Sequence, residues 1–164
     1  MSMKGNQEIF VSVGKTVWMG LLVVIFLLVS GGCAQKIIRI GEPLSADRRV
    51  VVNEVIDLVG KPYRVGGRGP DAFDCSGLVY HVYKKAGLIL PVTAEEQGLA
   101  GVATSREATL PGDIVVFKID RGFHVGIMLN EREFIHASKS RGVAISDLLV
   151  PYWSRNLRGF RSFL

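Results

Sequence analysis

The chain has 164 residues, which is room for one folded domain and a short appendage. Apolar residues make up 48% of the chain and charged residues 21%, and this balance excludes an intrinsically disordered protein. The formal net charge is +5 without any block of like charge, so nucleic acid is not expected as a partner. The pairs Arg48-Arg49 and Lys84-Lys85 are expected on solvated faces. The two cysteines, Cys33 and Cys75, are too few for a disulfide-stapled miniprotein and lack the spacing of a zinc ribbon.

The N-terminal segment has the pattern of an export signal. Residues 16–35 carry no charge and follow Lys4 and Lys15, which is the order of a basic n-region and an apolar h-region. Residues 1–32 are therefore predicted to be a signal peptide. The alternative is an uncleaved membrane helix, for which the 17 residues from Thr16 to Gly32 are at the short limit.

The end of this segment resembles a lipobox, the site where a bacterial lipoprotein is cleaved before a cysteine that is then acylated. The residues are Ser30-Gly31-Gly32-Cys33, and Ser30 stands where an aliphatic residue is usual. Cys33 is therefore predicted to be lipidated. Residues 33–46 are predicted to be the lipidated cysteine and a tether, which would hold a domain outside the cytoplasm on a membrane.

The folded part is predicted to begin with a helix over residues 47–59. Its apolar side chains have helical spacing, Asp47 is suited to the N-cap, and Gly60 is suited to the position after the helix. The segment 61–73 is dense in Gly and Pro and is predicted to be a loop that lines a site. Tyr63 is an isolated aromatic residue in this loop.

A second helix is predicted to begin at Cys75 and to end at Gly87. Its apolar stripe consists of Leu78, Val79, Val82, Tyr83 and Ala86. Cys75 lies in the middle of the stripe, so its sulfur is expected to point inward at the positive end of the helix, where the pKa of a thiol is lowered and a nucleophilic thiolate is favoured. An inert buried cysteine is the alternative, and the polar neighbours Asp74 and Ser76 argue against it.

The remainder of the chain changes to β-rich character. Residues 90–101 are interpreted as a connector, residues 151–153 as a bend and residues 158–164 as a final edge strand. The strands of an antiparallel meander are predicted at residues 114–118, 123–129, 133–138 and 142–146. Because the helices come first and the strands follow, residues 47–164 are predicted to form one α+β domain, with the N-terminal helices packed on one face of an antiparallel sheet.

Two histidines lie in neighbouring predicted strands. With a three-residue turn over residues 130–132, Gly126 is opposite His136, and His124 is its diagonal neighbour on the same face, with Cα atoms ~7 Å apart. A two-residue turn would place the rings on opposite faces. His81 is predicted on the polar side of the Cys75 helix, at the surface.

Five motifs of the chain together resemble, in order and spacing, the NlpC/P60 family of cysteine peptidases. The motifs are residues 60–67, 73–79, 110–117, 124–128 and 134–138. The resemblance implies a papain-like fold and hydrolysis of peptide bonds in the stem or cross-link peptides of peptidoglycan through a thioester. It also implies roles for three residues: Cys75 as the nucleophile, His124 as the general base and His136 as the orienting third residue.

The resemblance further implies how substrate is held. Tyr63, Asp74 and Ser76 match residues that bind the free N-terminal amine of the substrate, although Asp74 could be a simple helix cap. The oxyanion hole is expected to use the Cys75 backbone N–H, with the Tyr63 hydroxyl as a second donor. Peptidoglycan peptide is the expected partner, and no cofactor, metal or nucleic acid is expected.

Location and alternatives complete the expectations. The protein is expected to be a monomer in the bacterial cell envelope, lipid-anchored at the outer membrane and facing the periplasm. One alternative is an envelope module that binds zinc through Cys75, His124, His136 and Asp74. The others are a non-catalytic wall-binding protein and a thiol acyltransferase on the same fold.

Overall fold

The computed structural model describes residues 44–164, so the predicted signal peptide, Cys33 and most of the predicted tether lie outside the described residues. Within residues 44–164, no helix is both long enough and apolar enough to cross a membrane. The elements are, in chain order, α2 (Ala46–Asp57), α3 (Cys75–Lys85), α4 (Ala94–Leu99), β1 (Val102–Thr104), β2 (Ile114–Ile119), β3 (Gly122–Met128), β4 (Glu133–Ser138), β5 (Gly142–Asp147), α5 (Pro151–Asn156) and β6 (Leu157–Ser162).

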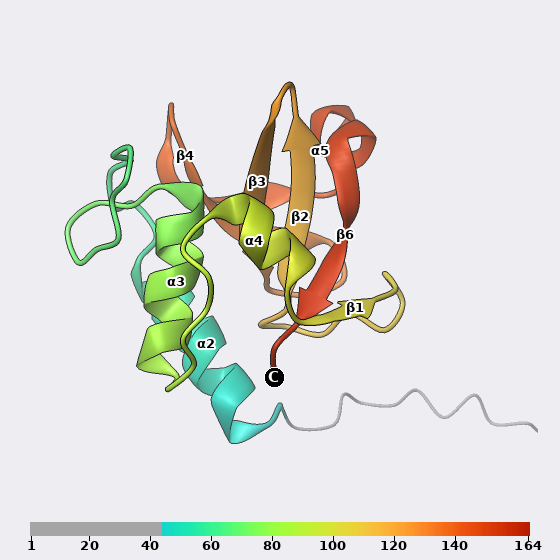
Figure 1. The fold of residues 1–164 in the computed structure, drawn as a ribbon, viewed down its shortest axis with the longest axis horizontal. Helices are drawn as coiled ribbons and strands as arrows, with labels where there is room; N and C mark the ends of the chain where they lie inside the picture. The colour runs from blue at the N-terminus through green and yellow to red at the C-terminus, as the bar shows by residue number, and fades with distance from the viewer. Residues whose placement is uncertain (1–43) are drawn as a thin grey trace, which may run out of the picture. The chain divides into compact units, whose positions relative to one another are not determined.

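The six strands form one antiparallel sheet in the order β1-β6-β2-β3-β4-β5. The helices α2 and α3 lie side by side against this sheet, with α4 across β2 and β3 (Figure 1). Alternate residues of the central strands, such as Val116, Val125 and Ile135, join the core beneath these helices. The predicted α+β class, with N-terminal helices on one face of an antiparallel sheet, is confirmed.

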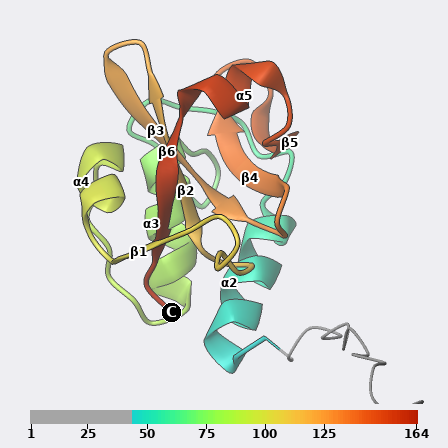
Figure 2. The ribbon, with the colours of Figure 1, turned by 90° about the vertical axis from the view of Figure 1, so that its right-hand side faces the viewer.

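The other face of the sheet carries a second, smaller core. It consists of Val115, Phe117, Met128, Phe134, Leu148 and Phe160. Trp153 of the short helix α5 packs against it, and α5 lies at one end of the sheet, beside β6 (Figure 2). Each central strand therefore has one apolar face for each core, which is why the runs IVVFK and EFIHAS are almost continuously apolar.

The first helix begins earlier and ends earlier than predicted. Ser45 is the N-cap of α2, and its hydroxyl accepts a hydrogen bond from the backbone N–H of Arg48, so the assignment of Asp47 as N-cap is wrong. The helix ends at Asp57, with Leu58 as C-cap. Gly60 has a φ of 90° and serves the following turn, where only glycine adopts this conformation without strain.

Arg48 is buried, so its placement on a solvated face is also wrong. Its guanidinium donates to Asp113 Oδ1 and to the carbonyl of Pro111, each at 2.9 Å. It also donates to Ser162 Oγ at 3.0 Å. The other oxygen of Asp113 accepts the N–H of Leu110. This ion pair ties α2 to the start of β2 and to the end of β6.

The interpretation of residues 90–101 as a connector missed the helix α4. Thr93 is its N-cap and accepts the N–H of Glu96, while its hydroxyl donates to the Glu96 carboxylate at 2.7 Å. The spacing Thr-x-x-Glu is a capping signal that the sequence already contained.

The C-terminal region also differs from the prediction in two respects. Residues 151–156 form the helix α5 rather than a bend, with proline in its first turn. The last strand, β6, is not an edge strand, because it lies between β1 and β2. The edge position belongs to β1, a three-residue strand that was not predicted.

Candidate active site

The N-terminus of α3 is built around Asp74 and Cys75. Asp74 is the N-cap, and its Oδ1 accepts the N–H of Gly77 at 2.7 Å and the hydroxyl of Ser76 at 3.2 Å. Its Oδ2 accepts the N–H of Gly66 at 2.8 Å, which ties the 61–73 loop to the helix. The structure therefore shows the capping role of Asp74.

The first turn of α3 is pressed closely against this loop. A Cβ at Gly77 would lie 1.9 Å from the carbonyl oxygen of Gly67, so only glycine fits. From the other side, the buried Gln97 of α4 donates to the carbonyls of Ser76 at 3.0 Å and Pro91 at 2.8 Å. Sequence reasoning missed Gln97, because its helix was not predicted. These contacts fix the position of Cys75.

The thiol of Cys75 lies where strands β3 and β4 separate. The ladder between these strands comprises Ile127–Ile135 and Met128–Phe134 and does not extend to Val125. Leu129 donates its N–H to Glu133 of β4. Because every second N–H of a strand points to the same neighbouring strand, the N–H of Val125 also points toward β4. Val125 lies beyond the last pair of the ladder, so β4 does not accept this N–H. There the Val125 N–H is close enough to the thiol to lower its pKa. The sulfur therefore lies near β3, at the residue that follows His124.

The charge state of this thiol differs from the sequence-based expectation. Burial raises the pKa of Cys75, and the negative charge of Asp74 also raises it. The N–H groups of Val125, Ser76 and Cys75 itself lower the pKa, but less than burial raises it. The predicted lowering of the thiol pKa is therefore wrong for the resting site. The sulfur is a neutral thiol that needs a base to become a nucleophile.

The two strand histidines lie in the predicted relation. The observed β3–β4 register is the one that follows from the three-residue turn, and the rings meet on one face of the sheet. His124 Nε2 and His136 Nδ1 are 2.8 Å apart. Gly126 makes this approach possible, since a Cβ there would lie 2.8 Å from the carbonyl oxygen of Ile135 and 3.2 Å from the Cβ of His136.

Aromatic rings cover the histidine pair. Trp153 stacks on His124 at a centroid distance of 5.7 Å and meets His136 edge-on at 4.8 Å. The ring of Phe117 lies next to His124, and the ring of Phe134 lies next to His136. The sequence indicated no such role for Trp153, because it lies in a helix interpreted as a bend.

Both imidazoles are uncharged at neutral pH as a result of this cover. Burial, with a smaller effect from the charge of Lys139, lowers the pKa of His124 to about 4. Burial, followed by the charges of His124 and Arg141, lowers the pKa of His136 to about 3. Since the Nε2 of His124 is engaged with His136, its Nδ1 is the nitrogen left for a reacting group. Within residues 44–164, no hydrogen bond joins the thiol to either ring in the resting structure.

Comparison with known proteins places the chain in a family. Residues 60–162 match the model of the NlpC/P60 family. The chain belongs to the NlpC/P60 family. The predicted resemblance is thereby confirmed.

Among its NlpC/P60 relatives is the murein DD-endopeptidase MepS/murein LD-carboxypeptidase of Escherichia coli K12, with 37% identity over 116 residues, 70% of this chain and 62% of the relative. Another is the gamma-DL-glutamyl hydrolase of Bacillus subtilis, with 40% identity over 127 residues, 74% of this chain and 30% of the relative. The chain thus spans less than two thirds of either relative. A solved NLP/P60 structure from Staphylococcus aureus superimposes with a TM-score of 0.67 and 35% identity, over 76% of this chain and 43% of that one.

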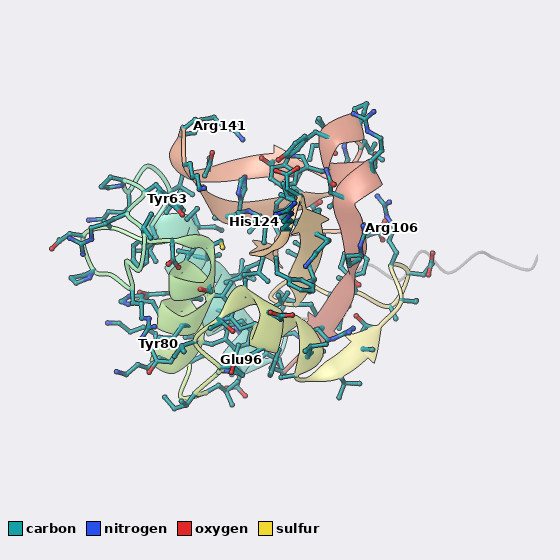
Figure 3. All side chains as sticks on the ribbon, turned by 45° about the horizontal axis from the view of Figure 1, so that its top comes forward. Tyr63, Tyr80, Glu96, Arg106, His124 and Arg141 are labelled. Carbon is teal, nitrogen blue, oxygen red and sulfur yellow. The ribbon has the colours of Figure 1, made fainter. Side chains whose placement is uncertain are left out.

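In this NlpC/P60 domain, the Tyr63 side chain lies near the start of α3. Burial raises the pKa of Tyr63, and so do the charge that Cys75 carries when it is ionised and the charge of Asp74, so the phenol lies near both groups. Tyr63 is half-buried and packs against the helix-side core (Figure 3). The structure thus brings Tyr63, Asp74, Cys75 and Ser76 to one place, as the family resemblance implied, and their binding of substrate stays a prediction.

His81 is the one histidine outside this group, and it is less exposed than predicted. Its Nε2 lies 3.5 Å from Glu54 Oε1 of α2, and its ring meets Phe73 edge-on at a centroid distance of 5.2 Å. The site has no ligand set for the zinc alternative, because no three Cys, His, Asp or Glu side chains within residues 44–164 are close enough together to hold a metal ion.

Proposed function

We propose that the protein is a cysteine endopeptidase that hydrolyses peptide bonds in the stem or cross-link peptides of peptidoglycan. The observation that carries the proposal is the 2.8 Å contact between His124 Nε2 and His136 Nδ1, with the Cys75 thiol near Val125, the residue that follows His124. A nucleophile, a base and a group that orients the base are the minimum that acyl transfer through a thioester requires. The endopeptidase and hydrolase names of its family relatives support the same chemistry.

The reaction begins from a neutral thiol and a neutral imidazole. His124 Nδ1 takes the proton of Cys75, and the sulfur attacks the scissile carbonyl carbon. The imidazolium then donates this proton to the leaving amine, and the C–N bond breaks to give a thioester and a free amine. His136 holds the Nε2–H of His124 through its Nδ1, which fixes the direction of Nδ1.

The second half of the reaction uses water. His124 Nδ1 takes a proton from a water molecule, whose oxygen attacks the thioester carbonyl, and the proton passes to the sulfur as the C–S bond breaks. A carboxylic acid leaves, and the thiol is restored. In both halves, the developing oxyanion is stabilised by the N–H of Cys75 at the N-terminus of α3 and by the hydroxyl of Tyr63.

Digestion of purified peptidoglycan tests this assignment, with products identified by mass spectrometry. We expect wild-type protein to release new stem-peptide fragments with free carboxylates, and Cys75→Ala to release none. His81→Ala is the matched control, because it removes a histidine that lies outside the site, and it should retain activity. Equal release by wild type and Cys75→Ala would overturn the proposed nucleophile. Fragments carrying a new amide or ester would show acyl transfer rather than hydrolysis.

We also propose that the protein is a lipoprotein anchored at the outer membrane and facing the periplasm. The support is in the sequence alone: an uncharged run over residues 16–35 that ends in Ser30-Gly31-Gly32-Cys33. Cells grown with a palmitate analogue should label the wild-type protein and Cys75→Ala equally but should not label Cys33→Ala. Labelling of Cys33→Ala at the wild-type level would contradict the anchor.

A further inference from the structure

The histidine pair continues into a third strand. His136 Nε2 lies 3.0 Å from Ser146 Oγ of β5, and Arg141, in the turn between β4 and β5, donates to the same oxygen at 2.8 Å. In the β4–β5 register, Phe134 is opposite Ser146 and His136 is opposite Ala144, so His136 and Ser146 are diagonal neighbours on one face. His124 and His136 have the same diagonal relation across β3 and β4. A polar line therefore crosses three adjacent strands and ends at Arg141.

We propose that Ser146 and Arg141 are positioning residues for the histidine pair. Ser146 accepts the Nε2–H of His136, and the Arg141 guanidinium keeps His136 uncharged, so that His124 alone carries the proton during the reaction. The catalytic part of this inference rests on the proposed function, whereas the state of His136 does not.

The donor and acceptor requirements of the four groups support this arrangement. A guanidinium only donates, so Ser146 Oγ accepts from Arg141 and keeps one lone pair and one proton for other partners. When His124 is an imidazolium, both of its nitrogens donate, so His136 Nδ1 must accept. A neutral His136 then carries its proton on Nε2, and Ser146 must accept that proton's hydrogen bond.

The reverse arrangement would stop the reaction. If Ser146 donated to His136 Nε2, the proton of His136 would lie on Nδ1 and point at His124 Nε2. His124 would then carry its own proton on Nδ1 and could not accept the proton of Cys75. The Ser146 hydroxyl can accept the hydrogen bond from His136 Nε2–H because a hydroxyl both donates and accepts, whereas the methyl group of alanine can do neither.

The charges around the histidine pair also oppose protonation of His136. Besides burial, the pKa of His124 is lowered by the charge of Lys139, and that of His136 is lowered by His124 and by the charge of Arg141. Lys139 and Arg141 are cations on the same turn. The remaining neighbours, Ser146 of β5 and Trp153 of α5, are uncharged. A proton that moved on to His136 would be lost to the leaving amine, and the nearby guanidinium opposes that step.

Three variants test the proposal, with Arg158→Gln as the matched control. Arg158 is exposed, and its side chain donates to the carbonyl of Leu157 rather than to the site. Arg141→Gln removes the charge, Arg141→Lys keeps the charge without the planar guanidinium, and Ser146→Ala removes the hydroxyl. Because Arg141 is itself exposed, its variants are expected to fold, and amide NMR spectra of all four proteins check this.

The first readout is the state of His136, measured by side-chain ¹⁵N NMR across a pH titration without any substrate. In wild type, His136 should be the neutral Nε2–H tautomer, with protonation only in strong acid. Arg141→Gln should move its titration midpoint up by about 1 pH unit, and Arg141→Lys should move it less. Ser146→Ala should lose the Nε2–H preference. An unchanged midpoint in Arg141→Gln, or a wild-type His136 that carries its proton on Nδ1, would overturn the proposal.

The second readout is the pH profile of kcat/KM. Arg141→Gln should shift its acid limb to higher pH, Arg141→Lys should shift the limb less, and Arg158→Gln should leave the limb in place. A merely structural arginine would lower activity equally at all pH values, which would contradict the positioning role. Because the NMR result needs no turnover, an inactive wild-type protein would refute the proposed function without deciding the state of His136.

Discussion

Two buried polar clusters in this domain offset the desolvation cost of burial in opposite ways, one as a charged pair and the other as neutral groups. Arg48 and Asp113 are 9% and 1% exposed at their side chains and remain charged, with the guanidinium and the carboxylate engaged by each other and by further partners. His124, His136 and Ser146 are also enclosed, but the rings are neutral, and the hydrogen bonds His124–His136 and His136–Ser146 are between uncharged groups. Only the arginine at the end of the line carries a charge.

This difference separates a structural site from a reactive one. A charged pair with every hydrogen bond made resists any change of protonation, because a proton lost or gained leaves a buried charge uncompensated. A neutral pair of imidazoles with one free nitrogen can take a proton at the moment of reaction and return it. The first cluster ties α2 to the sheet, and the second is the proposed base for Cys75.

The largest change in stability is expected when one charge of the structural cluster is removed. Arg48→Met should lower the free energy of unfolding by about 3–5 kcal/mol, because Asp113 would be left as an unpaired buried carboxylate. Urea unfolding at neutral pH measures the loss. The histidine cluster is separate, so the chemical reactivity of Cys75 per folded molecule should be unchanged.

A double variant provides the control for this prediction. Arg48→Met combined with Asp113→Leu removes both charges and should recover most of the stability that Arg48→Met alone loses. If the double variant were as unstable as the sum of the two single variants, the ion pair would not be the reason for the loss.

The sequence predicted the reactive cluster better than the structural one, for a physical reason. The alternation of a strand and the length of one turn fix the face and the register of His124 and His136, and both are visible in the sequence. The sequence around Arg48 does not predict its burial. Of the adjacent pair, Arg48 is buried and Arg49 is exposed, and Arg48 is paired with Asp113, which is distant in the sequence. That contact joins residues 65 positions apart in the chain.

The thiol shows a related limit. The position of Cys75 at a helix start was correctly predicted from Asp74 and the apolar stripe of α3. Its pKa was not, because the effect of the helix N-terminus is local whereas burial depends on the packing of the whole chain around it. Arg141 and Ser146 were missed for the same reason: each lies at an unremarkable sequence position and acquires a role only through the sheet.

A smaller effect should appear when the neutral cluster is exposed to acid. The folded-state pKa values of His124 and His136 lie below the ordinary value near 6.5, so the unfolded chain binds protons first as the pH falls. Stability is therefore fully present above about pH 6.5 and is lost as the pH falls to about 4 for His124 and about 3 for His136, by about 2 kcal/mol per ring at pH 5.

His136→Gln isolates one ring of the pair. The difference in unfolding free energy between pH 7.5 and pH 5 should be about 2 kcal/mol smaller in this variant than in wild type, since every other titrating group is common to both proteins. Urea unfolding of both proteins at the two pH values measures this difference in unfolding free energy. Equal pH dependence in the two proteins would mean that His136 takes up protons as readily in the folded state as in the unfolded chain.

The smallest effect is expected at Gln97, a buried polar side chain of a third kind. Its amide donates two hydrogen bonds, to Ser76 and Pro91, but its Oε1 is buried without a hydrogen-bond partner among the described residues. Gln97→Leu removes two hydrogen bonds to carbonyls and at the same time removes an unsatisfied acceptor, so the net loss should be only about 1 kcal/mol. Leu99→Ala is the control on the same helix, because Leu99 is 73% exposed, and it should change stability little. A loss at Gln97 as large as that of Arg48→Met would contradict this estimate, because it would mean that the unsatisfied Oε1 costs the folded protein nothing.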